Sequence, residues 1–461
     1  MKQNNGTDRK RRTAPAPGVP TPAGSDRAAA TPATAAGAPG EAAAPASARG
    51  VPDPATAAAR GSGDSPLRPR LAVQFGAGNI GRGFMGQLLH EAGFHIVFVD
   101  AAAELVAALE AEGRYPLRLL DAARGAAHEM QIDGFDAVAV SERQRIDDAV
   151  AAAEVIFTAV GVKYLPDIAP LLASGLRARR AAAAAPLDIY LCENLLDAAG
   201  QLREAVSSLL DDEERDWLRH AVGFVGTSVA RMVPVLPAEL RSDRPLLVVA
   251  DAFHKLPYDG AARRAPQPPI EGMYPVSDFG AEGQRKLFVY NMAHAALAYL
   301  GHQRSMRYVH EPFADPQAMR ILRGALDEAC AALAAKRPDV FSQEFLAETR
   351  ADILLRFANP MLQDTIERVG RDPIRKLGRD DRLVGCAMLC LGSGIRPQNV
   401  AALCAAALRY NRSGDPDAGR LQRLIAEHGP AAALAEVSGL DPSGDPDREL
   451  ISMVMEHYGS S

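Results

Sequence analysis

Three polar residues in the middle of the chain, Lys286, Asn291 and His294, have the types and the spacing of catalytic groups. A lysine can act as a general base when burial or a nearby cation lowers its pKa. An asparagine amide can donate to a developing alkoxide, and a histidine can orient a hydroxyl group. On an ideal helix, at about 100° per residue, the three side chains fall on one broad face. The spacing indicates a helix that could deprotonate an alcohol, but it also suits a lysine on a solvated face with two satisfied polar neighbours.

A glycine turn, Gly76-Ala-Gly78-Asn-Ile-Gly81, lies upstream between a buried apolar run, Leu71–Phe75, and a helical stretch. The first glycine permits a tight turn, the second lets the backbone approach a pyrophosphate, and the third lets the helix pack closely on the strand. The N–H groups that begin the helix are free to bind phosphate. Asp100 closes the next strand, where a carboxylate can accept from an adenosine ribose and would repel a 2′-phosphate. The turn therefore predicts a dinucleotide site, with NAD preferred over NADP.

The elements that must position these groups follow an alternating pattern. Apolar runs at 71–75, 94–99, 137–140, 155–160 and 187–192 predict strands, and helical stretches at 81–90 and 101–112 separate the first of them. Such alternation predicts a parallel sheet with right-handed crossovers. From about residue 286 helical periodicity dominates. We expect an α/β fold, with an N-terminal Rossmann-type doubly wound domain over 69–235 and a mainly α-helical C-terminal domain over 236–461.

Residues 1–68 are rich in Ala, Pro, Gly, Ser and Thr and contain the basic cluster Arg9–Arg12. Such a segment cannot bury enough apolar surface to offset the entropy of ordering, which predicts a disordered low-complexity tail. The shortage of acidic residues would suit a transit peptide, but the many prolines disfavour the amphipathic helix that such peptides form. We expect the tail to be dispensable for chemistry.

Charge and composition exclude several classes of protein. Ten Lys/Arg and five Asp/Glu give residues 1–70 a charge of +5, which leaves -11 of the total of -6 for the remainder and argues against a nucleic-acid partner. No apolar run reaches the roughly 20 residues that a membrane helix needs. The five cysteines are scattered and follow no secretory signal peptide, which is typical of core thiols in a reducing cytoplasm. We expect a cytoplasmic protein without a membrane partner; its oligomeric state stays open, and a monomer is one option.

The segment Arg285–Gly301 resembles the K-x-x-x-x-N-x-x-H signature of the polyol-specific long-chain dehydrogenases, the mannitol dehydrogenase family. Within that family the similarity is greatest to the enzymes of mannitol 1-phosphate, and it runs from about Leu71 to Gly439. Further motifs are similar in the same order along the chain: Phe75–Phe84, Thr158–Gly161, Cys192–Asn194, Val222–Val225, Arg356–Pro360 and Glu367–Leu377.

This resemblance implies a role for each candidate residue. Lys286 would be the general base that takes the hydroxyl proton, Asn291 and Asn194 would hold the alkoxide, and His294 would orient substrate hydroxyls. The family works without a metal ion, which agrees with the lack of a zinc-ligand cluster in the sequence. The implied contacts to NAD are at Phe75, Gly76, Ala77, Gly78, Asn79, Ile80, Gly81, Arg82, Asp100, Val160 and Gly161.

Four cations within nine residues bear on the substrate. Arg368 and Lys376 match basic residues that the wider family uses around its substrates, whereas Arg371 and Arg375 match extra charges of the phosphate-ester enzymes. Together they suit a dianion, although a solvated basic helix face has the same composition. We therefore expect NAD-dependent interconversion of D-mannitol 1-phosphate and D-fructose 6-phosphate. The alternatives are a dehydrogenase of an unphosphorylated polyol or hexonate (mannitol 2-dehydrogenase or fructuronate/tagaturonate reductase type) and a non-catalytic NAD(H)-binding sensor.

The sequence departs from the family pattern at two places. Ala230, in Val229-Ala-Arg-Met232, stands where the family usually has an acidic residue. The segment Asp251–Asp259 replaces one that usually contains a tryptophan. Both departures lie where we expect substrate specificity to be set.

Overall fold

The computed structural model describes residues 70–195, 197–235 and 242–459, and those residues belong to one compact unit, Leu67–Ser461. The predicted tail at 1–68 lies outside the described residues.

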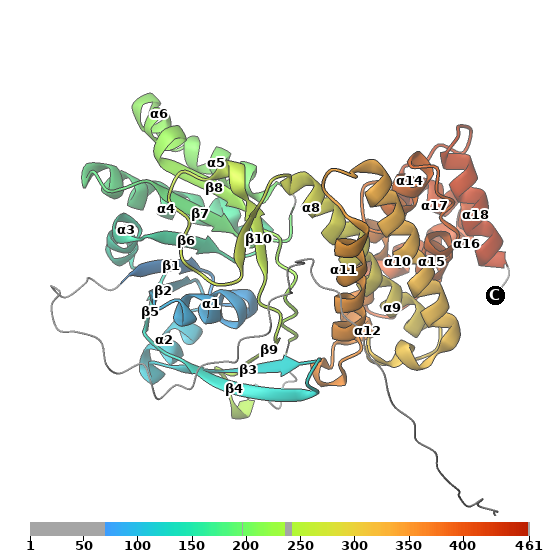
Figure 1. The fold of residues 1–461 in the computed structure, drawn as a ribbon, viewed down its shortest axis with the longest axis horizontal. Coiled ribbons are helices and arrows are strands. Elements are labelled where there is room, and N and C mark those ends of the chain that lie inside the picture. Colours follow the sequence, from blue (N-terminus) through green and yellow to red (C-terminus); the bar gives the residue numbers. More distant parts are fainter. Residues whose placement is uncertain (1–69, 196, 236–241, 460–461) are drawn as a thin grey trace, which may run out of the picture. The chain divides into compact units, whose positions relative to one another are not determined.

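A six-stranded parallel sheet forms the centre of the N-terminal half (Figure 1). Its strands are β1 (Leu71–Phe75), β2 (His95–Asp100), β5 (Phe135–Ala139), β6 (Val155–Thr158), β7 (Leu187–Leu191) and β8 (Val222–Gly226). Their spatial order is β5-β2-β1-β6-β7-β8, and every pair is parallel. This is the strand order of the dinucleotide-binding fold, in which ligands bind where the order reverses, here between β1 and β6. The predicted parallel sheet is confirmed.

Helices cover both faces of this sheet because neighbouring strand residues point to opposite sides. Ala72 packs in one hydrophobic core and Val73 in another. The first core holds η2 (Gly81–Met85), α1 (Gly86–Glu91) and α2 (Ala103–Glu112). The second holds α3 (Arg143–Ala152), α4 (Leu165–Ala181), α5 (Ala198–Ser207) and α6 (Asp212–Ala221). The sheet is therefore doubly wound, as predicted.

A second sheet of three strands has the order β4-β3-β9, from β3 (Tyr115–Asp121), β4 (Ala126–Ile132) and β9 (Val248–Asp251). A further parallel pair consists of β10 (Leu256–Asp259) and β11 (Met273–Val276). Val248 on β9 packs in the core of the N-terminal half, whereas its neighbour Val249 packs in the core of the helices that follow. The strand thus joins the two halves. The predicted boundary after residue 235 stays a prediction, and β9 lies C-terminal to it while pairing with β3.

The C-terminal half is mainly helical, as predicted. Its elements are α8 (Phe279–Arg285), η5 (Lys286–Asn291), α9 (Met292–His302), α10 (Pro316–Lys336), α11 (Gln343–Phe357), α12 (Ile366–Gly370), α13 (Pro373–Lys376), α14 (Val384–Gly392), α15 (Gln398–Leu408), α16 (Pro416–His428), α17 (Pro430–Ser438) and α18 (Asp447–Gly459). Short 3-10 turns lie at Val162–Tyr164, Gly260–Ala262, Glu311–Ala314 and Pro360–Leu362. Helix α9 is apolar almost all round and lies inside the core, as such a helix must. The core therefore holds the helix that carries His294 and directly follows Lys286 and Asn291.

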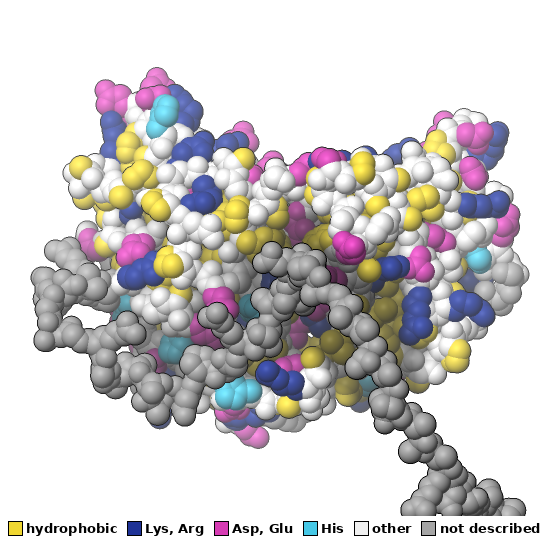
Figure 2. Space-filling view, viewed as in Figure 1, with side chains coloured by type: hydrophobic (Ala, Val, Ile, Leu, Met, Phe, Trp, Pro, Cys, Tyr) yellow, Lys and Arg dark blue, Asp and Glu magenta, His cyan; other side chains and the backbone are white. Residues whose placement is uncertain are grey.

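The face of the molecule seen in Figure 2 carries basic and acidic side chains interspersed with one another. No helix in the described part of the chain is long and apolar enough to cross a membrane.

Candidate active site

The glycine turn after β1 has the geometry that a pyrophosphate needs. Gly76 has a φ of +89°, and a Cβ on it would lie 2.5 Å from the Ala159 carbonyl oxygen. A Cβ on Gly81 would lie 1.9 Å from the Gly76 oxygen. Around Gly78, by contrast, no atom lies within 4 Å of the Cβ position, so the backbone there is open to a ligand. The turn is closed where the helix packs and open where a phosphate would approach, which fits a dinucleotide.

The helix after this turn begins as a π-helix over Gly81–Met85. The wider turn leaves carbonyls without their usual helical partners. The buried Tyr115 hydroxyl takes one of them, donating to the Arg82 oxygen at 2.8 Å. The Arg82 guanidinium donates to the oxygens of Ala77 and Leu246, at 2.7 and 2.8 Å. Arg82 is only 7% exposed, so it stabilises the glycine turn from the protein interior.

Asp100, at the end of β2, also holds the turn. One of its carboxylate oxygens accepts from the Ala77 N–H at 2.6 Å, and the other accepts from the Ala102 N–H at 2.8 Å. The carboxylate is thus fixed beside the glycine turn, at the strand end where a dinucleotide's ribose is bound.

The ends of β6 and β7 are tied together by Glu193, a buried residue that the sequence did not single out as functional. Its carboxylate accepts from the Thr158 hydroxyl at 2.7 Å and from the Val160 N–H at 3.0 Å. Burial raises the pKa of Glu193, and these two donors oppose that rise. Gly161, with a φ of +91°, then turns the chain. Because Glu193 is anchored, the next residue, Asn194, is held at the strand end with its side chain exposed.

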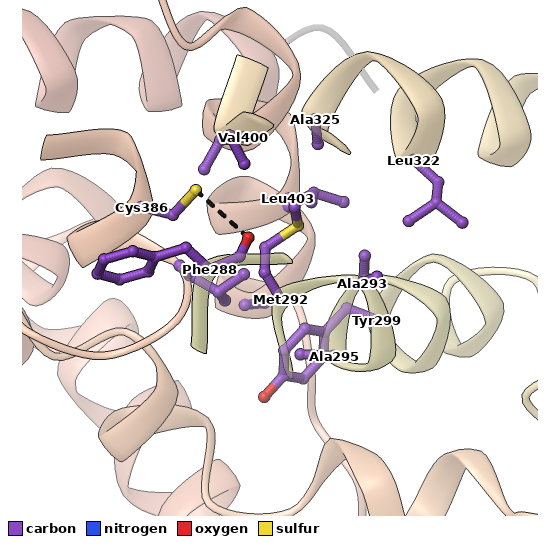
Figure 3. Packing of buried hydrophobic residues seen from close by; sticks show 14 of the residues in the cluster. Phe288, Met292, Ala293, Ala295, Tyr299, Leu322, Ala325, Cys386, Val400 and Leu403 are labelled. Atoms are coloured by element: carbon purple, nitrogen blue, oxygen red, sulfur yellow. Dashed lines mark hydrogen bonds between the residues drawn. The ribbon is translucent and has the colours of Figure 1, made fainter. Parts of the chain in front are cut away.

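Two of the candidate catalytic residues, Lys286 and Asn291, lie on a second π-helical segment, η5, and His294 follows on α9. On an α-helix two residues five positions apart point about 140° away from each other. The i→i+5 hydrogen bonding of a π-helix brings such residues to the same side, which aligns Lys286 with Asn291. Figure 3 shows the Cys386 thiol directed at the Phe288 carbonyl within this turn, with an S···O distance of 3.8 Å.

One cavity of ≈ 330 Å³ brings together the predicted residues Asn194, Lys286, Asn291, His294 and Arg368. They come from the end of β7, from η5 and α9, and from α12, so residues more than 170 positions apart in the sequence meet at one place. The other lining residues are Ile80, Cys192, Val229, Ala230, Arg231, Met232, Val233, Pro234, Tyr290, Leu362 and Asp364.

Lys286 has the environment of a general base. Its ammonium donates to the Asn194 Oδ1 at 3.2 Å. Burial lowers the pKa of Lys286 to about 8, with further lowering from the cations Arg285 and Arg382, while Glu282 opposes the change. A lysine with this pKa holds or releases its proton near neutral pH, which is the property that proton transfer to and from an alcohol requires.

His294 is fixed by a carboxylate that the sequence did not single out. Its Nε2 lies 2.9 Å from the Asp364 Oδ2, and its ring stacks on Phe357 with centroids 4.7 Å apart. Burial lowers the pKa of His294, so the imidazole is neutral at pH 7. With Nε2–H donated to Asp364, Nδ1 is left as the acceptor. The Arg368 guanidinium donates two hydrogen bonds to the same carboxylate, at 2.6 and 2.7 Å.

The remaining predicted substrate residues do not line this cavity. Arg371 is exposed and donates to the Arg368 oxygen at 3.3 Å. Arg375 is half exposed and lies 3.2 Å from an Asp381 carboxylate oxygen. Lys376 is 4% exposed, and burial followed by the charges of neighbouring arginines lowers its pKa to about 7.

The two departures from the family pattern meet in space. The buried Arg356 guanidinium donates to the Ala230 carbonyl at 2.5 Å and to the Asp251 carboxylate at 2.5 and 2.7 Å. Asp251 therefore places a carboxylate beside position 230, where the side chain lacks one. A second cavity of ≈ 390 Å³ borders this place and shares Ala230, Lys286 and Tyr290 with the first.

Replacing Asp251 by alanine is expected to lower the free energy of unfolding by about 3–5 kcal/mol. The buried Arg356 would lose its buried carboxylate and keep only the more exposed carboxylate of Asp352, at 3.2 Å. The charge of Asp251 also acts on Arg231, where it opposes the lowering of the pKa by burial; the Arg231 guanidinium has no hydrogen-bond partner among the described residues. Urea unfolding of the variant and of a Asp216→Ala control measures the change. Asp216 pairs at the surface with Arg219, so its loss should cost less than about 1 kcal/mol. Equal stability of the two variants would contradict the conclusion that the Asp251 carboxylate stabilises the buried Arg356.

Sequence comparison places this site in a known family. The model of the mannitol dehydrogenase Rossmann domain matches residues 70–272, and that of the mannitol dehydrogenase C-terminal domain matches residues 282–460. The mannitol-1-phosphate 5-dehydrogenase of Brevibacillus brevis is 36% identical over 381 residues, which are 83% of this chain and 96% of that protein. The enzyme of the same name from Bacillus licheniformis is 35% identical over 388 residues, 84% of this chain and 99% of that protein.

Solved structures share the fold. Mannitol 2-dehydrogenase of Pseudomonas fluorescens, in a ternary complex with NAD and D-mannitol, superposes with a TM-score of 0.66 at 19% identity, covering 85% of this chain and 92% of that one. A D-sorbitol dehydrogenase superposes with a TM-score of 0.69 at 18% identity, covering 84% and 92%. Both family domains and relatives of nearly full length match, and so the chain belongs to the mannitol dehydrogenase family.

Proposed function

We propose that this chain is an NAD-dependent oxidoreductase that interconverts D-mannitol 1-phosphate and D-fructose 6-phosphate. The observation that carries the proposal is the meeting of Lys286, whose pKa is lowered to about 8, with Asn194, Asn291 and His294 around one cavity. The names and near-complete coverage of the relatives support the phosphorylated substrate. The basic segment from Arg368 to Arg382 supports it independently, because a sugar phosphate is dianionic near neutral pH.

In the oxidation, the neutral amine of Lys286 accepts the proton of the substrate hydroxyl at Nζ. The Oδ1 of Asn194 accepts a hydrogen bond from Lys286, so the Nδ2 of Asn194 is free to donate to the substrate oxygen as that oxygen becomes negative. The amide of Asn291 donates to the same oxygen. His294 accepts a hydrogen bond at Nδ1 from a neighbouring hydroxyl of the substrate and so orients the sugar chain. In the reduction, the ammonium of Lys286 returns the proton to the ketone oxygen.

The glycine turn, Asp100 and the strand ends at Val160 and Gly161 are the residues that would hold NAD. When bound there, NAD supplies the acceptor for the hydride that leaves the alcohol carbon. The Asp100 carboxylate would repel a 2′-phosphate, which supports NAD over NADP.

The lowered pKa of Lys286 predicts opposite pH profiles for the two directions. Mannitol 1-phosphate oxidation needs the neutral amine, so kcat/KM should rise with pH and level off above about 8. Fructose 6-phosphate reduction needs the ammonium, so its rate should be level below about 8 and fall above it. Initial rates between pH 6 and 10 measure both profiles. Parallel profiles in the two directions would contradict Lys286 as the base.

The direct test of the substrate is NADH oxidation at 340 nm with fructose 6-phosphate and with fructose, each over a range of concentrations. We expect kcat/KM for fructose 6-phosphate to exceed that for fructose at least about 100-fold. Charge-assisted hydrogen bonds to the phosphate group need to supply only about 1.4 kcal/mol of binding free energy for each tenfold difference. Turnover of fructose alone would support a dehydrogenase of unphosphorylated polyols. Turnover of hexuronates alone would support the hexonate type, and NADH binding without turnover of any of these would support a sensor.

All five cysteines are buried free thiols, which supports the proposal that the protein works in the cytoplasm. The proposed partner is the small-molecule substrate.

A further inference from the structure

The loop between α13 and α14 lies against the turn that carries the catalytic lysine. Its ends are tied by a hydrogen bond from the Leu383 N–H to the Lys376 oxygen at 3.3 Å. Helix α14 then begins in direct contact with η5: a Cβ on Gly385 would lie 3.1 Å from the Phe288 ring, and Cys386 faces the Phe288 carbonyl (Figure 3). Arg382, at the end of this loop, is therefore placed beside η5.

Two cations at this loop, Lys376 at the end of α13 and Arg382 before α14, are buried, and some of their donors have no hydrogen-bond partner among the described residues. Arg382 is 9% exposed; its Nε and backbone N–H both donate to one Asp381 oxygen, at 2.7 and 2.6 Å. Its two terminal amino groups have no hydrogen-bond acceptor among the described residues. Lys376 is 4% exposed, and its ammonium likewise has no acceptor in the part of the chain that the structure describes. Both residues are therefore largely buried while their terminal nitrogens make no hydrogen bond within the described chain, which leaves these donors available to a ligand.

The charges near these groups are mostly positive. Burial, then Arg382 and then Arg375 lower the pKa of Lys376, so the cations repel one another. Arg382 also lowers the pKa of Lys286 and of His294, which places its charge within electrostatic reach of the catalytic cavity. The Asp381 carboxylate is shared between Arg375 and Arg382 and cannot neutralise all three cations.

We propose that Arg382, together with Lys376, binds the phosphate group of the substrate and so sets the preference for a phosphorylated sugar. The proposal rests on the proposed function. Arg382 presents two parallel donors, a geometry that matches two phosphate oxygens, and Lys376 adds a point charge. Arg371 and Arg375 are more exposed than Arg382 and Lys376 and already have partners. They would attract the phosphate group as it enters from solvent.

The test compares Arg382→Met and Arg382→Lys with the control Arg420→Met, an exposed arginine on α16. Fructose 6-phosphate reduction is followed at pH 7, together with competitive inhibition by inorganic phosphate. In Arg382→Met we expect the KM for fructose 6-phosphate and the Ki of inorganic phosphate each to rise at least about tenfold, with kcat changed less. Lysine should restore part of the loss, because it keeps the charge without the fork. The Arg420 variant should match wild type.

Unchanged KM and Ki in the Arg382 variants would overturn the assignment, as would equal losses in the control. Should Arg382→Met fail to fold, as judged by its melting curve and by NADH binding, Arg382→Lys carries the test, and a KM equal to that of wild type then overturns it. Failure of wild type to turn over fructose 6-phosphate is a different result, because it rejects the proposed substrate before any variant is compared.

Discussion

Replacing Lys286 by alanine is expected to lower kcat for fructose 6-phosphate reduction by about 10³–10⁴-fold, near the upper end of the effect of losing a general acid or base. No other group with a suitable pKa donates to Asn194, so the proton has no replacement carrier among the described residues. NADH affinity should stay within about twofold of wild type, because Lys286 makes no contact with the glycine turn. Steady-state rates and a fluorescence titration with NADH measure the two quantities.

Two further variants separate the base from its charge. Lys286→Arg keeps a cation but cannot release a proton, because the pKa of arginine exceeds about 12. It should therefore be as inactive as the alanine variant. Lys336, an exposed lysine at the end of α10, serves as the matched control, and Lys336→Ala should be unchanged. Activity within tenfold of wild type in either Lys286 variant would remove Lys286 from the role of base.

The parallel sheet could be predicted because its signals are local. The run Leu71–Phe75 is apolar, a glycine turn follows it, and Asp100 closes the next strand. Strands buried on both faces read as continuous apolar runs, so β1, β2, β6 and β7 were visible in the sequence. Strands β3 and β4 were not predicted: β4 is largely exposed and reads as polar sequence, and the apolar residues of β3 are interrupted by Pro116 and Arg118.

The π-helical geometry at η2 and η5 could not be predicted from periodicity, since it depends on groups far away in the chain. The Arg82 carbonyl freed at η2 is satisfied by Tyr115, and the Phe288 carbonyl at η5 faces Cys386. Sequence spacing predicts the candidate catalytic residues on one broad face of an ideal helix. The π turn brings Lys286 and Asn291 closer to the same side than an α-helix would.

Contacts between residues far apart in the chain could not be predicted from the sequence either. Nothing in the sequence around Ala230 indicates that Asp251, held by Arg356, supplies a carboxylate beside it. The same holds for Asp364, which lies 70 positions from His294 in sequence and 2.9 Å from it in space.

That contact gives the second large prediction: Asp364→Asn should lower kcat/KM by about 10–100-fold. The carboxylate accepts from His294 on one side and from both donors of Arg368 on the other. An amide has a single acceptor oxygen, so one of these neighbours would face an NH₂ group. Losing a hydrogen bond to a charged group costs about 1.5–3 kcal/mol, and about 1.4 kcal/mol corresponds to a tenfold change in rate. Steady-state kinetics measure the loss.

The kinetic constants distinguish a positioning role for Asp364 from a merely structural one, because only a positioning role lowers kcat without lowering stability. The carboxylate fixes the tautomer of His294, so kcat should fall while NADH affinity and the melting temperature change little. Glu367→Gln is the matched control, because Glu367 belongs to the same segment but pairs at the surface with Arg412 at 2.6 Å. Asp364→Glu should restore part of the activity, since it returns the charge at a changed distance. If Asp364→Asn stayed within twofold of wild type, or if the Glu367 variant lost as much, His294 would owe its orientation to the Phe357 ring alone.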